Sequence, residues 1–207
     1  MFCPIRKIIF THPPKCGGTS FEHFLGFKNY GEHCRLYKHS SLVDHVKAIE
    51  KINQNADDFA KISIIRNPWE RMVSWYFHLR EKALFAERFG KSKNQIQTLA
   101  YNLEFNDFVD RINKFNIEIF HRDFSYYMFG KSNTFEIDFV IRYENYKTDF
   151  LKCLEILKIP PISMNLIPFK NQGLIRSLDY KKYYRRESKE IVTKIYSEDI
   201  NFFNFSF

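Results

Sequence analysis

The chain has 207 residues, of which 44% are hydrophobic and 27% are charged. This length fits one folded domain with a sizeable core, and the composition argues against intrinsic disorder, so we expect a single domain over residues 1–207. Thirty-two basic and 24 acidic residues give a formal net charge of +8. That charge favours an anionic partner such as a nucleic acid, a membrane surface, a phosphorylated cofactor or an acidic glycan.

The four cysteines are scattered and show no CxxC spacing, so they indicate neither a zinc site nor a disulfide framework. No apolar run approaches the ~20 residues that a membrane-spanning helix needs. Residues 1–11 carry basic side chains among apolar ones and read as a strand rather than as a signal peptide. Together these features predict a cytoplasmic protein without a transmembrane segment, without a metal site and with reduced thiols.

Short apolar runs alternate with helical patterns along the chain. In chain order we expect a strand over residues 5–11, a helix over 19–25 capped by Thr19 or Gly18, a helix over 41–52 capped by Ser40 or Ser41, a strand over 59–65 and a helix from Pro68 through Leu79. The second half predicts an irregular helical excursion over 81–98, helices over 103–119, 148–157 and 187–203, and a strand over 137–143. This alternation predicts an α/β protein with a P-loop-like three-layer fold, in which helices flank a central parallel β-sheet.

A glycine-containing loop lies between the first expected strand and its helix. It reads Lys15-Cys16-Gly17-Gly18-Thr19-Ser20. Two consecutive glycines let backbone N–H groups approach an anion, and the helix that follows adds its partial positive end. Lys15 supplies a full charge, and Thr19 and Ser20 supply hydroxyl donors. A Walker A loop has its lysine after the glycines, whereas Lys15 precedes them, and the dinucleotide fingerprint G-x-G-x-x-G is absent.

A second motif follows the second expected strand and reads Arg66-Asn67-Pro68-Trp69-Glu70-Arg71-Met72-Val73-Ser74-Trp75-Tyr76. Arg66 is placed to offer a planar fork of donors to a phosphate. Ser74 lies eight residues later, two helical turns along, and so comes near Arg66 only if the strand end bends toward the helix. Arg71 could bind a second anion or form an ion pair, and the two tryptophans fit a core. Ligands of parallel sheets bind at the carboxyl ends of strands, where both motifs are expected.

At this point the chain resembles the sulfotransferases that use 3′-phosphoadenosine-5′-phosphosulfate (PAPS), in their carbohydrate branch (sulfotransferase family 2) with its heparan sulfate, chondroitin and bacterial members. HPPKCGGTSF resembles the 5′-phosphosulfate loop of that family, and IIRNPWERMVSWY resembles its 3′-phosphate motif. FVIRYENY and EIVTKIYSEDINFF resemble a strand and the closing helix of the family. The resemblance implies that PAPS is the co-substrate, that a hydroxyl-bearing carbohydrate is the acceptor and that no metal takes part.

The resemblance also implies roles for single residues. Lys15, Gly17, Gly18, Thr19 and Ser20 would hold the 5′-phosphosulfate, with Lys15 neutralising the oxygen that leaves. Arg66 and Ser74 would hold the 3′-phosphate. Cys16 replaces the more usual threonine, and its backbone N–H can still serve.

The acceptor hydroxyl needs a general base. His39 is our first candidate, because relatives carry a catalytic histidine in a comparable H-x-S context. Glu22 is the second candidate, although a residue inside the first helix also fits an ion pair at the edge of the core. His12 stands beside the loop and could touch the phosphosulfate or make a structural hydrogen bond. Glu144 is expected to pair with a cation, either Arg142 or Arg66.

The acceptor side is marked by dispersed cations, which could line a groove or simply form a solvated face: Lys28, Arg35, Lys38, Arg80, Lys82, Arg88, Lys91 and Lys93. A late loop with Lys170, Asn171 and Arg176 could fold over the co-substrate. Two other functions share some of these features. A P-loop nucleotide kinase would need a lysine after the glycines and an aspartate for Mg²⁺, and a basic nucleic-acid-binding module would need exposed aromatic residues among its basic ones.

Overall fold

The computed structural model describes residues 1–26, 39–160, 162–163, 166–167 and 179–207. The chain divides into two compact units. Unit 1 comprises Met1–Arg66 and Phe124–Asn171, and unit 2 comprises Asn67–Asp123 and Gln172–Phe207. The first boundary between the units falls inside the second motif, directly after Arg66. The single domain expected over residues 1–207 stays a prediction.

In the described part of unit 1, the sheet has four strands in the order β1-β2-β3-β4. These are β1 (Phe2–Cys3), β2 (Ile8–Thr11), β3 (Ala60–Ile65) and β4 (Phe139–Arg142). Strands β2, β3 and β4 are parallel, whereas β1 pairs antiparallel with β2. A mixed α/β architecture with a largely parallel central sheet is therefore confirmed, with one antiparallel edge strand as the departure.

The prediction of one strand over residues 5–11 is wrong at its start. The chain turns between β1 and β2, where Lys7 adopts a φ of 53°. Ile5 is 79% exposed in this turn, whereas every residue of β2 is buried. Ile5 is apolar but is not buried, so its apolar character did not indicate a strand position in the core.

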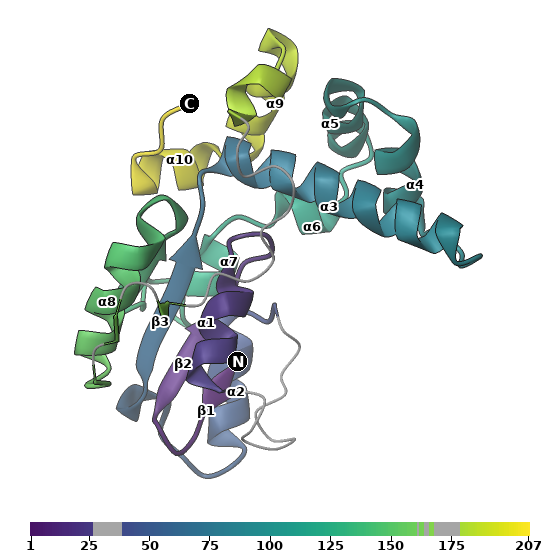
Figure 1. The fold of residues 1–207 in the computed structure, drawn as a ribbon. Helices are drawn as coiled ribbons and strands as arrows, with labels where there is room; N and C mark the ends of the chain where they lie inside the picture. Colours follow the sequence, from purple (N-terminus) through teal and green to yellow (C-terminus); the bar gives the residue numbers. More distant parts are fainter. Residues whose placement is uncertain (27–38, 161, 164–165, 168–178) are drawn as a thin grey trace. The chain divides into compact units, whose positions relative to one another are not determined.

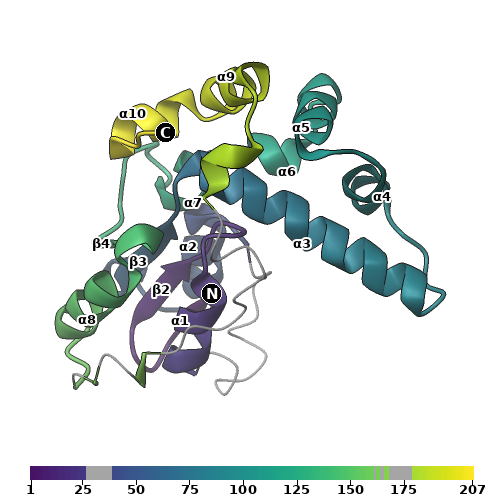
Figure 2. The same cartoon turned by 45° about the horizontal axis from the view of Figure 1, so that its top comes forward.

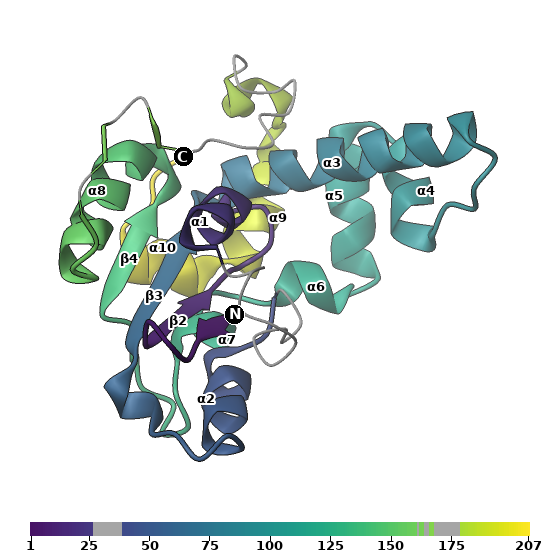
Figure 3. The ribbon, with the colours of Figure 1, turned by 60° about the horizontal axis from the view of Figure 1, so that its bottom comes forward.

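Helices flank the sheet of unit 1 on both sides. They are α1 (Gly18–Leu25), α2 (Leu42–Glu50), α7 (Ser125–Met128) and α8 (Tyr146–Ile156), with the short 3₁₀ turns η3 (Ala56–Asp58) and η4 (Tyr143–Asn145). Figure 1 shows α1 in front of the sheet and α2 behind it. The ring of Phe150 on α8 lies 5.4 Å from that of Phe21 and 4.9 Å from that of Phe24, so α8 packs beside α1. Helix α2 packs against β2 and α7 (Figure 3).

The predicted cap of α2 is confirmed at Ser41. The Ser41 hydroxyl accepts from the backbone N–H of Asp44 at 3.1 Å, and the Asp44 carboxylate accepts from the backbone N–H of Ser41 at 3.1 Å. This reciprocal capping box satisfies two N–H groups at the start of the helix. Helix α2 therefore has a defined beginning just after His39, one of the candidate bases.

Unit 2 is helical in its described residues (Figure 2). It contains α3 (Pro68–Arg88), α4 (Gln95–Asn102), α5 (Phe105–Lys114), α6 (Glu118–His121), η7 (Tyr180–Tyr183), α9 (Arg186–Ile195) and α10 (Ser197–Phe203). Asn67 caps α3, because its side-chain oxygen accepts from the N–H of Trp69 at 3.1 Å. Trp69 and Trp75 belong to the buried core of this unit, as their spacing predicted.

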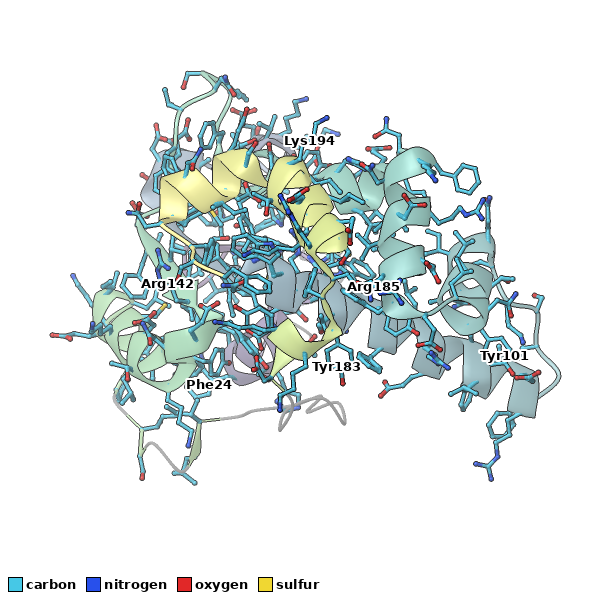
Figure 4. All side chains as sticks on the ribbon, turned by 90° about the horizontal axis from the view of Figure 1, so that it is seen from above. Phe24, Tyr101, Arg142, Tyr183, Arg185 and Lys194 are labelled. Carbon is cyan, nitrogen blue, oxygen red and sulfur yellow. The ribbon has the colours of Figure 1, made fainter. Side chains whose placement is uncertain are left out.

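Three helix predictions in unit 2 differ from the structure. The helix predicted over 103–119 is two helices, α5 and α6, because the chain turns between them at Asn116, where φ is 45°. Helix α3 runs on to Arg88 because Ala83 and Ala86 are buried along its length, where α4 packs against it. Tyr101 belongs to α4 (Figure 4). The ammonium of Lys93 lies 4.0 Å from the centroid of its ring. The helix predicted over 187–203 is two helices that meet at Tyr196, a buried residue whose hydroxyl donates to the backbone oxygen of Phe120.

Candidate functional site

The glycine-containing loop connects β2 to α1 in unit 1. Lys15 and Gly17 both adopt left-handed conformations, with φ of 67° and 86°. Gly17 is the N-cap of α1, one residue before Gly18 and two before Thr19, the two predicted caps. The first turn of α1 carries no acidic side chain, so the partial positive charge of the helix start is not offset within the helix. The loop therefore presents backbone N–H groups and a lysine at one place.

Two aromatic rings lie against the paired glycines. A Cβ added to Gly17 would lie 2.9 Å from Cδ2 of Tyr143, and one added to Gly18 would lie 2.2 Å from Cδ2 of His12. Real Cβ atoms do not approach other atoms so closely. Both glycines are therefore required by close packing, and Gly17 is also favoured by its positive φ.

Arg66 reaches the same loop from the end of β3. Its Nη1 donates to the backbone oxygen of Lys15 at 3.1 Å, and its guanidinium carbon lies 4.1 Å from the ring centroid of Tyr143. Because β2 and β3 are parallel neighbours, their carboxyl ends lie at the same edge of the sheet. The prediction that the two motifs meet at this edge is confirmed for Lys15 and Arg66.

The other loop residues are more enclosed. Cys16 is fully buried, and its thiol lies 3.7 Å from the backbone oxygen of Pro14. Ser20 is buried and Thr19 is partly buried, both in the first turn of α1. A buried thiol bonded to a carbonyl behaves as a small core side chain, which fits the expectation that Cys16 contributes its backbone.

The remaining residues of the second motif belong to unit 2. Ser74 lies partly buried on α3, and its role toward the 3′-phosphate stays a prediction. Arg71 is fully buried, and its guanidinium lies 5.5 Å from the ring centroid of Tyr196. Burial argues against Arg71 as the binding site for an anion from solvent.

The two candidate bases, His39 and Glu22, form one connected cluster with His12. Oε1 of Glu22 lies 2.7 Å from Nδ1 of His12, and the two side chains are 6% and 3% exposed. Nδ1 of His39 lies 2.6 Å from the backbone oxygen of His12, and the two imidazole centroids are 4.9 Å apart. His39 is more exposed than the other two residues. Its position distinguishes it as the member of the cluster that solvent can reach.

The hydrogen bond of His39 determines which of its ring nitrogens can take a proton. A carbonyl oxygen only accepts, so Nδ1 of His39 carries the hydrogen and donates it to His12. In the neutral ring the lone pair is then on Nε2. Nε2 of His39 is thereby prepared to accept a proton. The carboxylate of Glu22, in contrast, contacts His12. This contact agrees with the expectation that a residue inside the first helix fits an ion pair.

Tyr143 is the site residue that sequence reasoning missed. It directly follows β4, the third parallel strand, and so lies at the same edge of the sheet as Lys15 and Arg66. The pairing of Glu144, which is exposed, with Arg142 or Arg66 stays a prediction, whereas the ring over Arg66 is that of Tyr143. Ligands of parallel sheets bind at the carboxyl ends of the strands, and this rule, which located Arg66, applies equally to the residue after β4.

The cations expected on the acceptor side are only partly described. Lys28, Arg35 and Lys38, and likewise Lys170, Asn171 and Arg176, lie outside the described residues. The others lie on or just after the second half of α3 in unit 2. Some make local contacts there: Lys93 lies 3.5 Å from the carboxylate of Glu87, and Arg80 lies 3.9 Å from that of Glu104. These local partners favour the solvated-face interpretation for the two residues.

Across the described ranges, no group of three or more His, Cys, Asp or Glu side chains is placed to hold a metal ion. Within the same ranges, none of the helices combines the length and apolarity that crossing a membrane requires.

Comparison with known proteins identifies the chain. A family model described as the sulfotransferase family matches residues 1–206. Neither the curated proteins nor the solved structures gave a significant match. The match covers essentially the whole chain and both motifs, and it supports transferase activity of the sulfuryl-transferring kind. The chain therefore belongs to the sulfotransferase family.

Proposed function

We propose that this chain transfers a sulfuryl group from PAPS to the hydroxyl of an acceptor, and that the acceptor is a carbohydrate. The observation that carries the proposal is the meeting of Arg66 with the Lys15 loop at the carboxyl edge of β2 and β3. A glycine-rich turn at the positive end of a helix suits a phosphosulfate, and a guanidinium from the next strand suits a second phosphate. The P-loop-like character of the fold belongs to the same proposal.

The donor would be held by the residues that the motifs predicted. Backbone N–H groups of Cys16, Gly17 and Gly18 and the hydroxyls of Thr19 and Ser20 would bind the 5′-phosphosulfate. Arg66 and Ser74 would bind the 3′-phosphate. The ring of Tyr143 would brace Arg66, since a guanidinium stacked on an aromatic face keeps its donors in one plane.

The reaction is an in-line displacement at sulfur. The acceptor oxygen forms a bond to sulfur as the bond from sulfur to the phosphate oxygen breaks, and adenosine 3′,5′-bisphosphate leaves. The acceptor proton passes to Nε2 of His39, and the ammonium of Lys15 neutralises the departing oxygen. Catalysis of this kind depends mainly on positioning and on charge stabilisation.

The two competing functions are less well supported. A nucleotide kinase calls for a lysine after the glycines, and here Lys15 precedes them. A nucleic-acid-binding module calls for exposed aromatic residues among basic ones and for a reader motif. Exposed Phe85 and Phe89 do lie beside Lys91 and Arg88, but the sequence shows no reader motif and many other aromatics are buried in the core. The preference for a carbohydrate acceptor rests on the family resemblance, and a cytoplasmic location stays a prediction from sequence.

The experiment is a transfer assay with ³⁵S-labelled PAPS against a panel of glycans, lipids and phenols. We expect label in a glycan fraction. A parallel thermal-unfolding series compares adenosine 3′,5′-bisphosphate with ATP–Mg²⁺ and with oligonucleotides. A ligand present at a hundredfold its Kd adds about 2.7 kcal/mol of stability. Stabilisation by ATP–Mg²⁺ alone, or by oligonucleotides alone, would exclude the proposal.

A further inference from the structure

The cluster of Glu22, His12 and His39 contains a buried carboxylate–imidazole pair that the transfer reaction does not use directly. Glu22 and His12 are 5% and 3% exposed, and their side chains are joined at 2.7 Å. Burying a charged or polar pair costs free energy unless each group is satisfied, so such a pair fixes the geometry of its surroundings. The elements that it joins are the end of β2 and the middle of α1.

The side chain of His12 is held on three sides. Glu22 bonds to Nδ1, the ring of Phe10 stacks at 5.7 Å, and the backbone of Gly18 lies against the opposite edge, where an added Cβ would be 2.4 Å from Nε2. Because His12 precedes Pro13, its own backbone is restricted to extended conformations. A fixed ring and a restricted backbone together fix the direction of the His12 carbonyl.

That carbonyl is the acceptor for Nδ1 of His39 at 2.6 Å. The direction of the carbonyl therefore selects which nitrogen of His39 carries the hydrogen, and it sets where Nε2 points. The same histidine whose ring packs on Gly18 of the anion-binding loop thus orients the candidate base. His12 therefore links the anion-binding loop to His39, the candidate base.

We propose that Glu22 is a positioning residue: by holding the His12 ring, it fixes the His12 carbonyl and thereby keeps His39 in the tautomer with hydrogen on Nδ1. His12 transmits this constraint, and neither Glu22 nor His12 exchanges a proton with the acceptor. The catalytic consequence of the inference rests on the proposed function, because it assumes that His39 is the base. The tautomer itself does not depend on that assumption.

The test is long-range ¹H–¹⁵N correlation spectroscopy of the imidazoles at a pH where His39 is neutral. Its signals are assigned by their absence from a His39→Gln variant. The wild-type protein is expected to show His39 with hydrogen on Nδ1. Glu22→Met keeps the length of the side chain but removes the acceptor, so His39 should shift toward the Nε2–H form. Glu22→Gln keeps an oxygen acceptor for Nδ1 of His12 and should restore the wild-type spectrum.

A matched control uses His45, a second histidine bonded to a backbone carbonyl among the described residues of this unit. Nδ1 of His45 lies 2.6 Å from the Ser41 oxygen, and the side chain is fully buried. His45→Asn should lower stability and leave the tautomer of His39 unchanged. A His39 that keeps its hydrogen on Nδ1 in Glu22→Met, or that lacks it in the wild-type protein, would overturn the inference. A wild-type spectrum without hydrogen on Nδ1 overturns the inference even if Glu22→Met does not fold.

Turnover provides the second readout. Glu22→Met should lower kcat on the order of a hundredfold, as for a misplaced catalytic group, and Glu22→Gln should recover most of it. Equal kcat in Glu22→Met and the wild-type protein would contradict the positioning role. If the wild-type protein transfers no sulfuryl group at all, the proposed function fails, whereas the spectra still decide the fate of the inference.

Discussion

The imidazole of His12 occupies the space that a side chain on Gly18 would need. A Cβ there would lie 2.2 Å from Cδ2 of His12, and His12 cannot withdraw without breaking its 2.7 Å contact with Glu22. Gly18→Ala should therefore destabilise the fold by about 1–3 kcal/mol, as overpacking does, and should displace the anion-binding loop. Thermal unfolding and calorimetric titration with adenosine 3′,5′-bisphosphate measure the two effects.

Gly90 provides the control for that substitution. Its φ is 61°, and an added Cβ would meet no atom within 4 Å. Gly90→Ala should cost only about 1 kcal/mol of backbone strain and leave nucleotide affinity unchanged. Wild-type affinity in Gly18→Ala would show that the loop does not hold the nucleotide.

Lys15→Ala should lower kcat by a factor on the order of 10² to 10³, because the ammonium is proposed to neutralise charge that develops on the leaving oxygen. The KM for PAPS should change much less. Lys158→Ala is the matched control, since Lys158 has a similar left-handed conformation, with φ of 53°, at the end of α8. Steady-state kinetics with both variants would contradict the role of Lys15 if their kcat values were alike.

Tyr143 should contribute to nucleotide affinity through Arg66. Removing the ring in Tyr143→Ala takes away a cation–π contact of about 0.5–2 kcal/mol, which corresponds to a loss of roughly 2- to 30-fold in affinity. Tyr143→Phe keeps the ring and should bind as the wild-type protein does. Titration with adenosine 3′,5′-bisphosphate compares them, and equal affinities for Tyr143→Ala and Tyr143→Phe would exclude this support.

Stability should fall in acid because of His45. Burial, and next the positive charge of the Met1 amino group, hold the pKa of His45 well below its usual value, while its bond to Ser41 opposes them. The unfolded chain takes up a proton near pH ~6.5 that the folded chain refuses, so the free energy of unfolding decreases as pH falls below that value.

The slope should approach about 1.4 kcal/mol per pH unit between that value and the lowered pKa of His45. His45→Gln should flatten the dependence of Tm on pH between 5 and 7. A His45→Gln variant with the wild-type slope would show that His45 is not the titrating group.

The sequence predicted the parts of the fold that periodicity and turn chemistry determine locally. The strand at β3, the Pro68 start of α3 and the Ser41 cap all follow from residues within a few positions of each other. The end of α3 and the break at Tyr196 could not be predicted in this way. Both depend on packing partners that are distant in the sequence, α4 in one case and Phe120 in the other.

The residues of the candidate site also divide into those that the sequence could locate and those that needed the structure. Lys15 and Arg66 could be located because parallel strands end at one edge, a rule that needs no side-chain geometry. A comparison of His39 with Glu22 needed distances, since the two residues differ in burial and in a hydrogen bond that joins His39 to the backbone of His12. Tyr143 was missed because its contacts with Gly17 and Arg66 join three separate strand ends.

A crystal structure of the protein with adenosine 3′,5′-bisphosphate tests the central claim most directly. The account predicts the 5′-phosphate against the backbone N–H groups of residues 16–20 and the 3′-phosphate within hydrogen-bonding distance of the Arg66 guanidinium. A nucleotide bound away from Gly17 and Gly18, or one whose phosphates leave Arg66 untouched, would contradict it.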